Sequence, residues 1–423
     1  MKSNTDKKYL YGLLSYNSIN IGDEIQSVAC SRFLPQIDEL VYREMINSFV
    51  SEDCKKTKLI MNAWWMWKSK NFLPSKCIEP LLISMFIRPE IRKEILTENV
   101  RKYLLNNGPV GCRDMSTYEW LQNENIPSYF SGCLTLTLQR NYEIPRENYI
   151  LCVDVKPELV EAIKKRTTRP VYDISRMLSP YYTSEQRLDV AKVMLRLYQD
   201  AHLVVSSRLH VILPSLAMET PVLRIISDEQ EMGDFDRYKG YETFFNSYTN
   251  EEIINNPTAY NFDEPLANPN NHLKLRNDLI NKCQKFTGYN NTNSLIDKNI
   301  NPAVEIIRLN RNSYRQIERL SYWLTPKSLK KVLKNRLKGY NQYDLIGFNI
   351  FKNEGLFKLY FNKFKYKLLY KICTGKKKEH YVTKLNQINK YLKYHLDTEQ
   401  TQTLVTVERE RERERESNKP NGL

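Results

Sequence analysis

The residues best suited to chemistry lie in one short segment, Ser206-Ser207-Arg208-Leu209-His210. The guanidinium of Arg208 is a forked donor that suits a phosphate or a carboxylate. His210 can exchange a proton near neutral pH, and Ser206 and Ser207 add two hydroxyls. This combination favours an anionic substrate and a proton-transfer reaction.

A strand and a helix are expected to position this segment. The apolar run 202–205 predicts a buried strand, and the apolar residues that follow Arg208 predict a helix. The segment then stands at the carboxyl end of the strand and at the amino end of the helix. Free backbone N–H groups and the positive end of the helix dipole favour an anion at that position.

Strand and helix signals alternate from residue 9 to residue 226, and one further helix is expected in the Asn- and Pro-rich stretch 250–300. Strands are predicted at 9–15, 57–61, 110–112, 128–137, 149–155, 169–174, 202–205 and 221–226, and helices at 23–33, 90–105, 115–124, 157–166, 184–200 and 272–285. Such alternation is typical of α/β proteins with parallel sheets, here two doubly wound Rossmann-like domains. Ligands of these folds bind at the carboxyl ends of strands and in the cleft between domains.

Changes in composition suggest the domain boundaries. The polar stretch 140–148, which contains Pro145, predicts a first domain over 1–142 and a second over 143–300. Residues 301–400 are rich in Lys, Tyr and Phe and predict a basic, mainly helical extension. The Glu-Arg alternation near the end predicts a disordered or solvated tail over 401–423.

The net charge of +15 lies in the extension, because 301–400 holds 22 Lys and Arg against 7 Asp and Glu. Three hypotheses fit it: a packed helical extension, association with an anionic inner membrane surface, and nucleic-acid binding. An aromatic stripe flanked by lysines is typical of an interfacial helix, so the membrane surface is favoured. No nucleic-acid motif supports the third hypothesis.

The eight cysteines form no Cys-x-x-Cys pair, so free thiols in a reducing compartment and no zinc site are expected. No signal peptide or membrane span is predicted. We therefore expect a cytoplasmic protein, held peripherally at the inner membrane face by residues 301–400, with no metal and no cofactor.

Motifs in order along the chain resemble those of the polysaccharide pyruvyl transferase family. They are the Asn-x-Gly-Asp turn at 20–23, the Gly-Cys-Arg-Asp loop at 111–114 with the Gly-Cys-Leu-Thr run at 132–135, and the Arg-x-His helix at 208–210 that leads to Thr-Pro at 220–221. The resemblance covers roughly residues 9–285. One departure is Glu219, where the family commonly has glycine; a positive φ there would cost about 1 kcal/mol.

The resemblance implies an architecture similar to glycosyltransferase-B. It also implies transfer of a pyruvyl group from phosphoenolpyruvate to a sugar or lipid-linked glycan of a cell-surface polysaccharide precursor, as a cyclic ketal, with release of phosphate. By analogy Arg208 and His210 are catalytic. The substrate-binding residues expected with them are Ser206, Ser207, Arg113, Asp114, Asn20, Gly22 and Asp23.

The donor's chemistry is compatible with these residue types. Its carboxylate and phosphate need cationic groups such as Arg208 and Arg113. Forming the ketal requires protonation of the methylene carbon, and a histidine can supply that proton. A carboxylate such as Asp114 or Glu24 could stabilise the resulting cationic carbon.

Other readings stay open at this point. His210 could be a satisfied residue at a helix start, Arg113 and Asp114 a surface ion pair, and residues 20–23 only a turn and helix cap. Trp64, Trp65 and Trp67 are more typical of a core than of a sugar-binding surface, although an exposed one could stack on an acceptor. For the whole chain, the alternatives are a nucleotide-sugar glycosyltransferase and a non-catalytic glycan-binding or scaffold protein.

Overall fold

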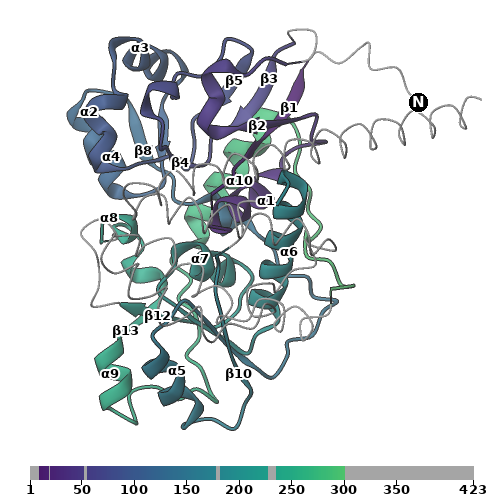
Figure 1. Cartoon of the computed structure of the whole chain (residues 1–423), viewed down its shortest axis with the longest axis vertical. Helices are drawn as coiled ribbons and strands as arrows, with labels where there is room; N and C mark the ends of the chain where they lie inside the picture. Colours follow the sequence, from purple (N-terminus) through teal and green to yellow (C-terminus); the bar gives the residue numbers. More distant parts are fainter. Residues whose placement is uncertain (1–8, 19, 52–54, 178–181, 227–234, 301–423) are drawn as a thin grey trace, which may run out of the picture. The chain divides into compact units, whose positions relative to one another are not determined.

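The computed structural model describes residues 9–18, 20–51, 55–177, 182–226 and 235–300 (Figure 1). All of these residues belong to one compact unit, Met1–Arg315. The predicted extension at 301–400 and the predicted tail at 401–423 lie outside the described residues. The boundary between 142 and 143 remains a prediction.

The first sheet contains four parallel strands in the order β2-β1-β3-β5. They are β1 (Leu10–Ser15), β2 (Glu39–Tyr42), β3 (Thr57–Ile60) and β5 (Ile78–Leu81). Two shorter parallel pairs follow in the same half of the chain: β4 (Trp64–Trp65) with β6 (Phe86–Ile87), and β7 (Val110–Cys112) with β8 (Ser128–Phe130).

The second sheet contains five parallel strands in the order β10-β9-β11-β12-β13. They are β9 (Ile150–Val153), β10 (Val171–Ile174), β11 (Leu203–Ser206), β12 (Val222–Ile226) and β13 (Asn246–Thr249). Every residue of β9 and β11 is buried, as expected for central strands covered by helices on both faces. The prediction of an α/β fold with parallel sheets is confirmed.

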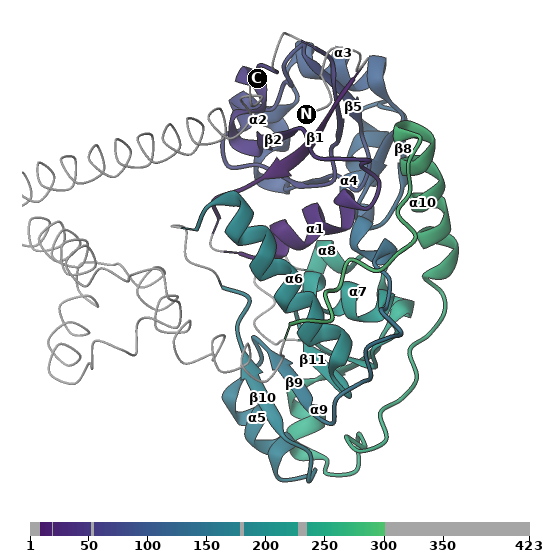
Figure 2. The same ribbon diagram turned by 90° about the vertical axis from the view of Figure 1, so that its right-hand side faces the viewer.

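Helices alternate with the strands and cover the sheets (Figures 1 and 2). The α-helices are α1 (Gly22–Ser31), α2 (Arg92–Ile95), α3 (Glu98–Asn107), α4 (Met115–Asn123), α5 (Pro157–Lys164), α6 (Ser184–Asp200), α7 (Leu209–Ala217), α8 (Phe235–Tyr238), α9 (Asn250–Asn255) and α10 (Leu273–Thr287). Short 3₁₀ turns are η2 (Arg43–Ser48), η4 (Ser69–Asn71), η5 (Pro89–Ile91), η6 (Leu134–Thr137) and η7 (Glu242–Phe244).

Both sheets reverse their strand order at a central strand. The reversal lies between β1 and β3 in the first sheet and between β9 and β11 in the second. In open parallel sheets, ligands bind beside the carboxyl ends of the strands at such a reversal. The loop that joins β1 to α1 and the turn that joins β11 to α7 leave the sheets at these two points.

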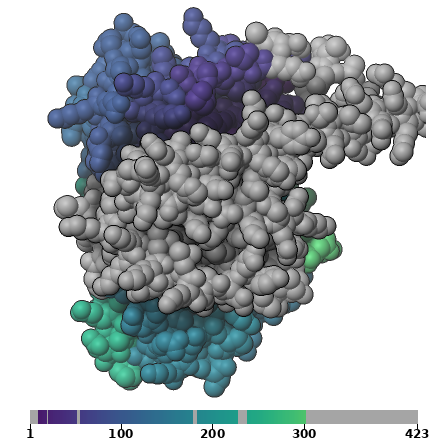
Figure 3. All heavy atoms as spheres, viewed as in Figure 1, coloured from purple at the N-terminus to yellow at the C-terminus, as the bar shows by residue number. Residues whose placement is uncertain are grey.

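Helices of the two sheets pack against each other around α1, which contacts α6, α7 and η6. Figure 2 shows α1 beside α6, with α7 below it. On the face seen in Figure 3, residues of the first half form the purple-to-blue surface and residues of the second half the teal-to-green surface. Side chains from both halves therefore meet at α1.

Two predicted elements differ from the structure. The helix expected at 90–105 is broken, because the Thr97 hydroxyl accepts the Val100 N–H at 3.3 Å and begins a new helix there. The run at 128–137 is a strand only as far as Phe130. Gly132 then takes a positive φ of 70°, and η6 replaces the expected strand.

Candidate active site

His210 lies at a bend in α7 that the sequence itself produces. Pro214, four residues later, has no N–H for the His210 carbonyl, and its ring crowds that carbonyl. His210 accordingly leaves the helical conformation, with φ −83° and ψ 18°. Arg208 is the N-cap residue of the same helix. The family-like Arg-x-His pair therefore occupies the first turn of a helix at the strand-order reversal of the second sheet.

The two serines before Arg208 hold the turn between β11 and α7. The Ser206 hydroxyl donates to the Val153 carbonyl at 2.8 Å and accepts the Arg208 N–H at 3.0 Å. The Ser207 carbonyl accepts the Tyr238 hydroxyl at 2.6 Å. Ser206 is fully buried, so its visible function is to shape the turn. Substrate contact by either serine stays a prediction.

The first and third motifs meet at Gly22, the first residue of α1. A Cβ at Gly22 would lie 2.9 Å from His210 Nδ1 and 3.0 Å from Asn20 Oδ1. The Gly22 N–H donates to that same Asn20 oxygen at 3.0 Å. Glycine is required because the imidazole fills the space of a side chain, so the motif at 20–23 forms part of the His210 environment.

The loop after β10 closes the site on another side. Asn20 forms an antiparallel bridge with Met177, and the Ile21 N–H donates to the Arg176 carbonyl at 3.1 Å. The Arg176 side chain forms an ion pair with Asp154 at 3.2 Å. The carboxyl ends of strands from both sheets are thus connected through backbone hydrogen bonds beside α1.

Arg113, from the end of β7, is buried with only 2% of its surface exposed. Its guanidinium carbon lies 4.6 Å from the centre of the Phe86 ring, and its NH1 donates to Gln26 Oε1 at 3.2 Å. Its Nε has no hydrogen-bond partner in the described ranges. No carboxylate within those ranges forms an ion pair with Arg113, although the neighbouring Asp114 acts on its charge.

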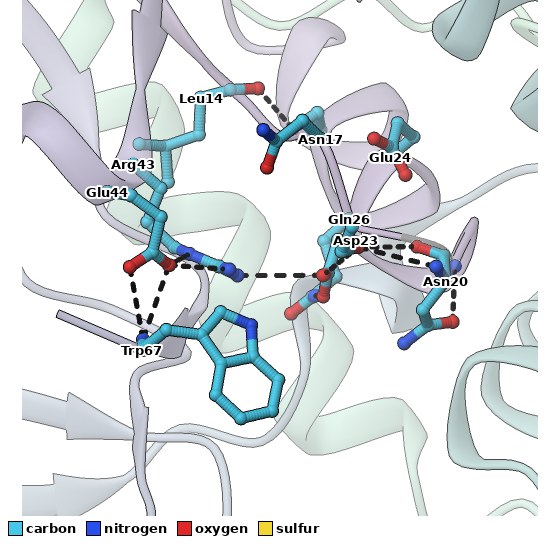
Figure 4. A network of polar contacts seen from close by, with 12 residues as sticks. Leu14, Asn17, Asn20, Asp23, Glu24, Gln26, Arg43, Glu44 and Trp67 are labelled. Carbon is cyan, nitrogen blue, oxygen red and sulfur yellow. Dashed lines mark hydrogen bonds and ion pairs between the residues drawn. The ribbon is translucent and has the colours of Figure 1, made fainter. Parts of the chain in front are cut away.

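The other buried arginines near α1 do have carboxylate partners. Arg43 contacts Glu44 at 2.8 Å and Asp23 at 3.5 Å, and Arg187 contacts Glu24 at 2.5 Å. Figure 4 shows the Arg43 pairs within a network that runs from Asn20 to Trp67. Of Arg43, Arg187 and Arg113, only Arg113 forms no ion pair with a carboxylate of the described residues.

Two further arginines, Arg176 and Arg237, approach the same place; sequence reasoning missed both. The Arg237 guanidinium lies 5.5 Å from the Phe86 ring that Arg113 also covers. We call Arg113, Arg176 and Arg237 the arginine cluster. Arg176 follows a strand end as Arg113 does, which is a usable signal in the sequence. Arg237 lies in a helix of one turn and carries no such signal.

The electrostatics at His210 follow from this cluster. Burial of the imidazole, followed by the charges of Arg113, Arg237 and Arg176, lowers the pKa of His210 well below its usual value. Its Nε2 is buried and has no hydrogen-bond partner in the described part of the chain. His210 is therefore a neutral imidazole with one ring nitrogen left for a ligand, which argues against a satisfied helix-start histidine.

The Asp114 side chain caps a helix, which is not the position expected of a substrate ligand. Its carboxylate accepts the Thr117 N–H at 2.8 Å and the Thr117 hydroxyl at 3.0 Å as the N-cap of α4. Burial raises its pKa. Both Arg113 and Asp114 are buried, so the surface ion-pair reading is wrong. A substrate role for Asp114 stays a prediction.

Asp23 is bound by other protein groups. Its carboxylate accepts the Ser18 hydroxyl at 3.0 Å and the Gln26 amide at 3.4 Å, and it pairs with Arg43. These contacts fix the start of α1, against which His210 packs through Gly22. Direct contact of Asp23 with a substrate also remains a prediction.

Among the described residues, no helix has both the length and the apolar character needed to cross a bilayer. The cysteines that lie there are free thiols. The expected peripheral association with a membrane stays a prediction.

Known proteins resemble the chain to different extents. No curated protein matches it. The crystal structure of a functionally uncharacterised protein from Klebsiella pneumoniae matches 57% of this chain and 92% of its own, with 14% identity and a TM-score of 0.37, which is too low to support an argument. Residues 83–229 match the family model for polysaccharide pyruvyl transferase, and this range contains Arg113, Arg208 and His210. The resemblance seen in the sequence is thereby confirmed over residues 83–229, and this match supports a transferase.

Proposed function

We propose that the chain moves a pyruvyl group from phosphoenolpyruvate onto two hydroxyls of a sugar in a cell-surface polysaccharide precursor. The observation that supports this most is the arginine cluster around the His210 imidazole, in which the buried Arg113 forms no ion pair with a carboxylate of the described residues. Such a cluster favours a multiply charged anion. Phosphoenolpyruvate brings a carboxylate and a phosphate within one small molecule.

The proposed reaction begins with a proton on His210. The donor's negative charge offsets the arginine charges, so His210 takes up a proton when the donor binds. The π electrons of the donor then accept that proton at the methylene carbon, which leaves an oxocarbenium-like centre. One sugar hydroxyl adds to this centre and returns its proton to His210. The second hydroxyl displaces phosphate, which leaves with the second hydroxyl proton, and a cyclic ketal remains.

Arg208 and Arg113 are proposed to hold the donor's anionic groups. The N-terminal turn of α7 adds free backbone N–H groups beside Arg208, and Gly22 allows the imidazole to lie against the start of α1. No resident cofactor or metal takes part in this proposal, since the donor is itself a substrate.

We also propose the finer features of the architecture and location. The two parallel sheets, with α1, α6 and α7 between them, fit a two-domain arrangement similar to glycosyltransferase-B. Residues 301–400 would hold the protein near an anionic membrane, where lipid-linked acceptors are found. Cytoplasmic location belongs to the same proposal.

The test is isothermal calorimetry of phosphoenolpyruvate with wild type, Arg208→Ala and His210→Ala. We expect Arg208→Ala to lose about 1.5–3 kcal/mol of binding energy, the usual value of a charge-assisted contact. His210→Ala should keep most of the affinity, because the imidazole acts on the reaction more than on binding.

Two results would contradict the proposal. One is wild-type protein that binds no phosphoenolpyruvate but binds a nucleoside diphosphate sugar, which would indicate a glycosyltransferase. The other is binding of neither donor, with or without a glycan present, which would favour the non-catalytic scaffold.

A further inference from the structure

An aromatic surface borders the hydrophobic core of the first half. Trp67 is 65% exposed, whereas Trp65 is fully buried. The rings of Trp64 and Trp67 meet edge to face with centres 4.8 Å apart. The Arg88 guanidinium lies 5.3 Å from the Trp64 ring and 5.0 Å from the Trp67 ring. We call Trp64, Trp67 and Arg88 the indole platform.

Buried groups hold the indole platform in place. The Glu44 carboxylate accepts the backbone N–H of Trp67 at 3.1 Å and that of Lys68 at 2.9 Å. Arg43 pairs with the same carboxylate and lies 4.9 Å from the Trp64 ring. Figure 4 shows Trp67 beside this Arg43–Glu44 pair. An exposed indole on a loop fixed by a buried carboxylate is preorganised for a ligand.

Two routes connect the platform with the His210 site. Through the sheet, Trp64 is the register partner of Phe86, whose ring lies beneath Arg113 and Arg237. Through the polar network, the arginine that stacks on Trp64 also pairs with Asp23, next to Gly22. The platform therefore borders the arginine cluster.

The chemistry of the platform suits a pyranose. The face of a sugar ring presents C–H bonds, which carry partial positive charge and pack on the electron-rich face of an indole. The Arg88 Nε is buried and pairs with the Glu90 carboxylate at 3.6 Å, so the terminal nitrogens of its guanidinium are the donors for sugar hydroxyls. A small anion, by contrast, does not pack on the electron-rich face of an indole.

We propose that the indole platform binds a pyranose ring of the acceptor glycan and directs its hydroxyls toward the arginine cluster. This inference rests on the proposed function for the direction of the acceptor, although the binding itself does not require the donor. Trp67 supplies the stacking face, and Arg88 and Trp64 limit the orientation of the ring.

The experiment measures sugar binding without any donor. Wild type, Trp67→Ala and Trp67→Phe are titrated with methyl β-D-galactopyranoside, methyl β-D-glucopyranoside and methyl β-D-mannopyranoside, using saturation-transfer NMR. We expect at least one pyranoside to bind, with affinity about 10-fold weaker in Trp67→Ala and partly restored in Trp67→Phe. Phosphoenolpyruvate affinity should be the same in all three proteins.

Tyr142→Ala is the matched control. Tyr142 is 70% exposed, and the Arg140 guanidinium lies 5.1 Å from its ring, so it reproduces an arginine stacked on an exposed aromatic residue. This substitution should leave pyranoside binding unchanged. Equal affinity in Trp67→Ala and wild type, an equal loss in Tyr142→Ala, or no pyranoside binding by wild type would overturn the inference. Pyranoside binding that depends on Trp67, without phosphoenolpyruvate binding, would contradict only the donor proposal.

Discussion

At the scale of single residues, the state of His210 is the most informative property of the site. Its neighbours are cationic, and both burial and charge remove its proton. His210 can act as a proton donor only after an anion has bound beside it. The donor anion would therefore supply the charge that makes His210 an acid, so that protonation and donor binding occur together.

This coupling predicts proton uptake on donor binding. The pKa of His210 lies well below 6.5 in the free protein and should rise toward that ordinary value in the complex. Affinity should therefore increase as the pH falls through this window, and the complex should take up a proton at pH 6 but not at pH 8. Calorimetry in buffers of different ionisation enthalpy measures this uptake. The donor's own ionisation contributes equally in His210→Gln, so identical uptake by both proteins would contradict the coupling.

At the scale of elements, the end of α7 carries strain. Glu219 closes the helix with a φ of 63°, a conformation that favours glycine. The departure noted in the sequence therefore has the expected conformational cost. The side chain offsets part of it, because the Glu219 carboxylate accepts the Tyr142 hydroxyl at 2.6 Å.

Substitution at Glu219 should separate the backbone strain from the side-chain contact. Glu219→Ala loses the contact and keeps the strain, whereas Glu219→Gly loses both. We expect Glu219→Gly to be more stable than Glu219→Ala by about 1 kcal/mol in urea unfolding. Donor binding should change in neither variant, because Glu219 lies at the opposite end of α7 from His210. Equal stability of the two variants would show that the left-handed conformation costs nothing here.

At the scale of the whole described unit, one ion pair joins helices that belong to different sheets. Glu24 on α1 and Arg187 on α6 contact at 2.5 Å and are both buried. Burial raises the pKa of Glu24 to about 7, although Arg187 opposes the shift. Between pH 4.5 and 7 the Glu24 carboxyl therefore binds a proton more tightly in the native protein than in the unfolded chain. The contribution of Glu24 to the free energy of unfolding falls as the pH rises through that window.

Removal of Arg187 should make this pH dependence stronger. Arg187→Met leaves a buried carboxylate without its counter-charge, which typically costs about 3–5 kcal/mol. We expect the loss to be larger at pH 8 than at pH 6, where Glu24 can take up a proton instead. Urea unfolding at the two pH values provides the measurement. The double variant Glu24→Gln with Arg187→Met should recover most of the stability, and a loss independent of pH would argue against the raised pKa.

The sequence predicted the regular elements and the position of the Arg-x-His pair because their signals are local. Apolar runs predicted β11 and α7. Strands β2, β5 and β13 were missed because they mix polar with apolar positions, and β5 also contains Pro80. The strands β9 and β11 are equally short, but their runs are almost wholly apolar, which is the signal that predicts a buried strand.

The site was only partly predictable for a related reason. Motifs at 20–23 and 208–210 were recognised separately, but their contact through Gly22 and His210 depends on packing between distant segments. Asp114 has the residue type of a ligand, and only its hydrogen bonds with Thr117 identify it as a helix cap. Arg237 reaches the site from a short helix late in the chain, and its neighbours in the sequence give no hint of that position.

The charge of Arg113 also links ligand binding to stability. Arg43 and Arg187 each form an ion pair with a carboxylate, whereas no carboxylate of the described residues forms one with Arg113, and Asp114 acts on its charge without such a contact. An anion that binds beside Arg113 should therefore raise the melting temperature of the protein. Inorganic phosphate and pyruvate, the two fragments of the proposed donor, should each raise the melting temperature by less than phosphoenolpyruvate does. The site that binds the donor is then also a site where an anion stabilises the fold.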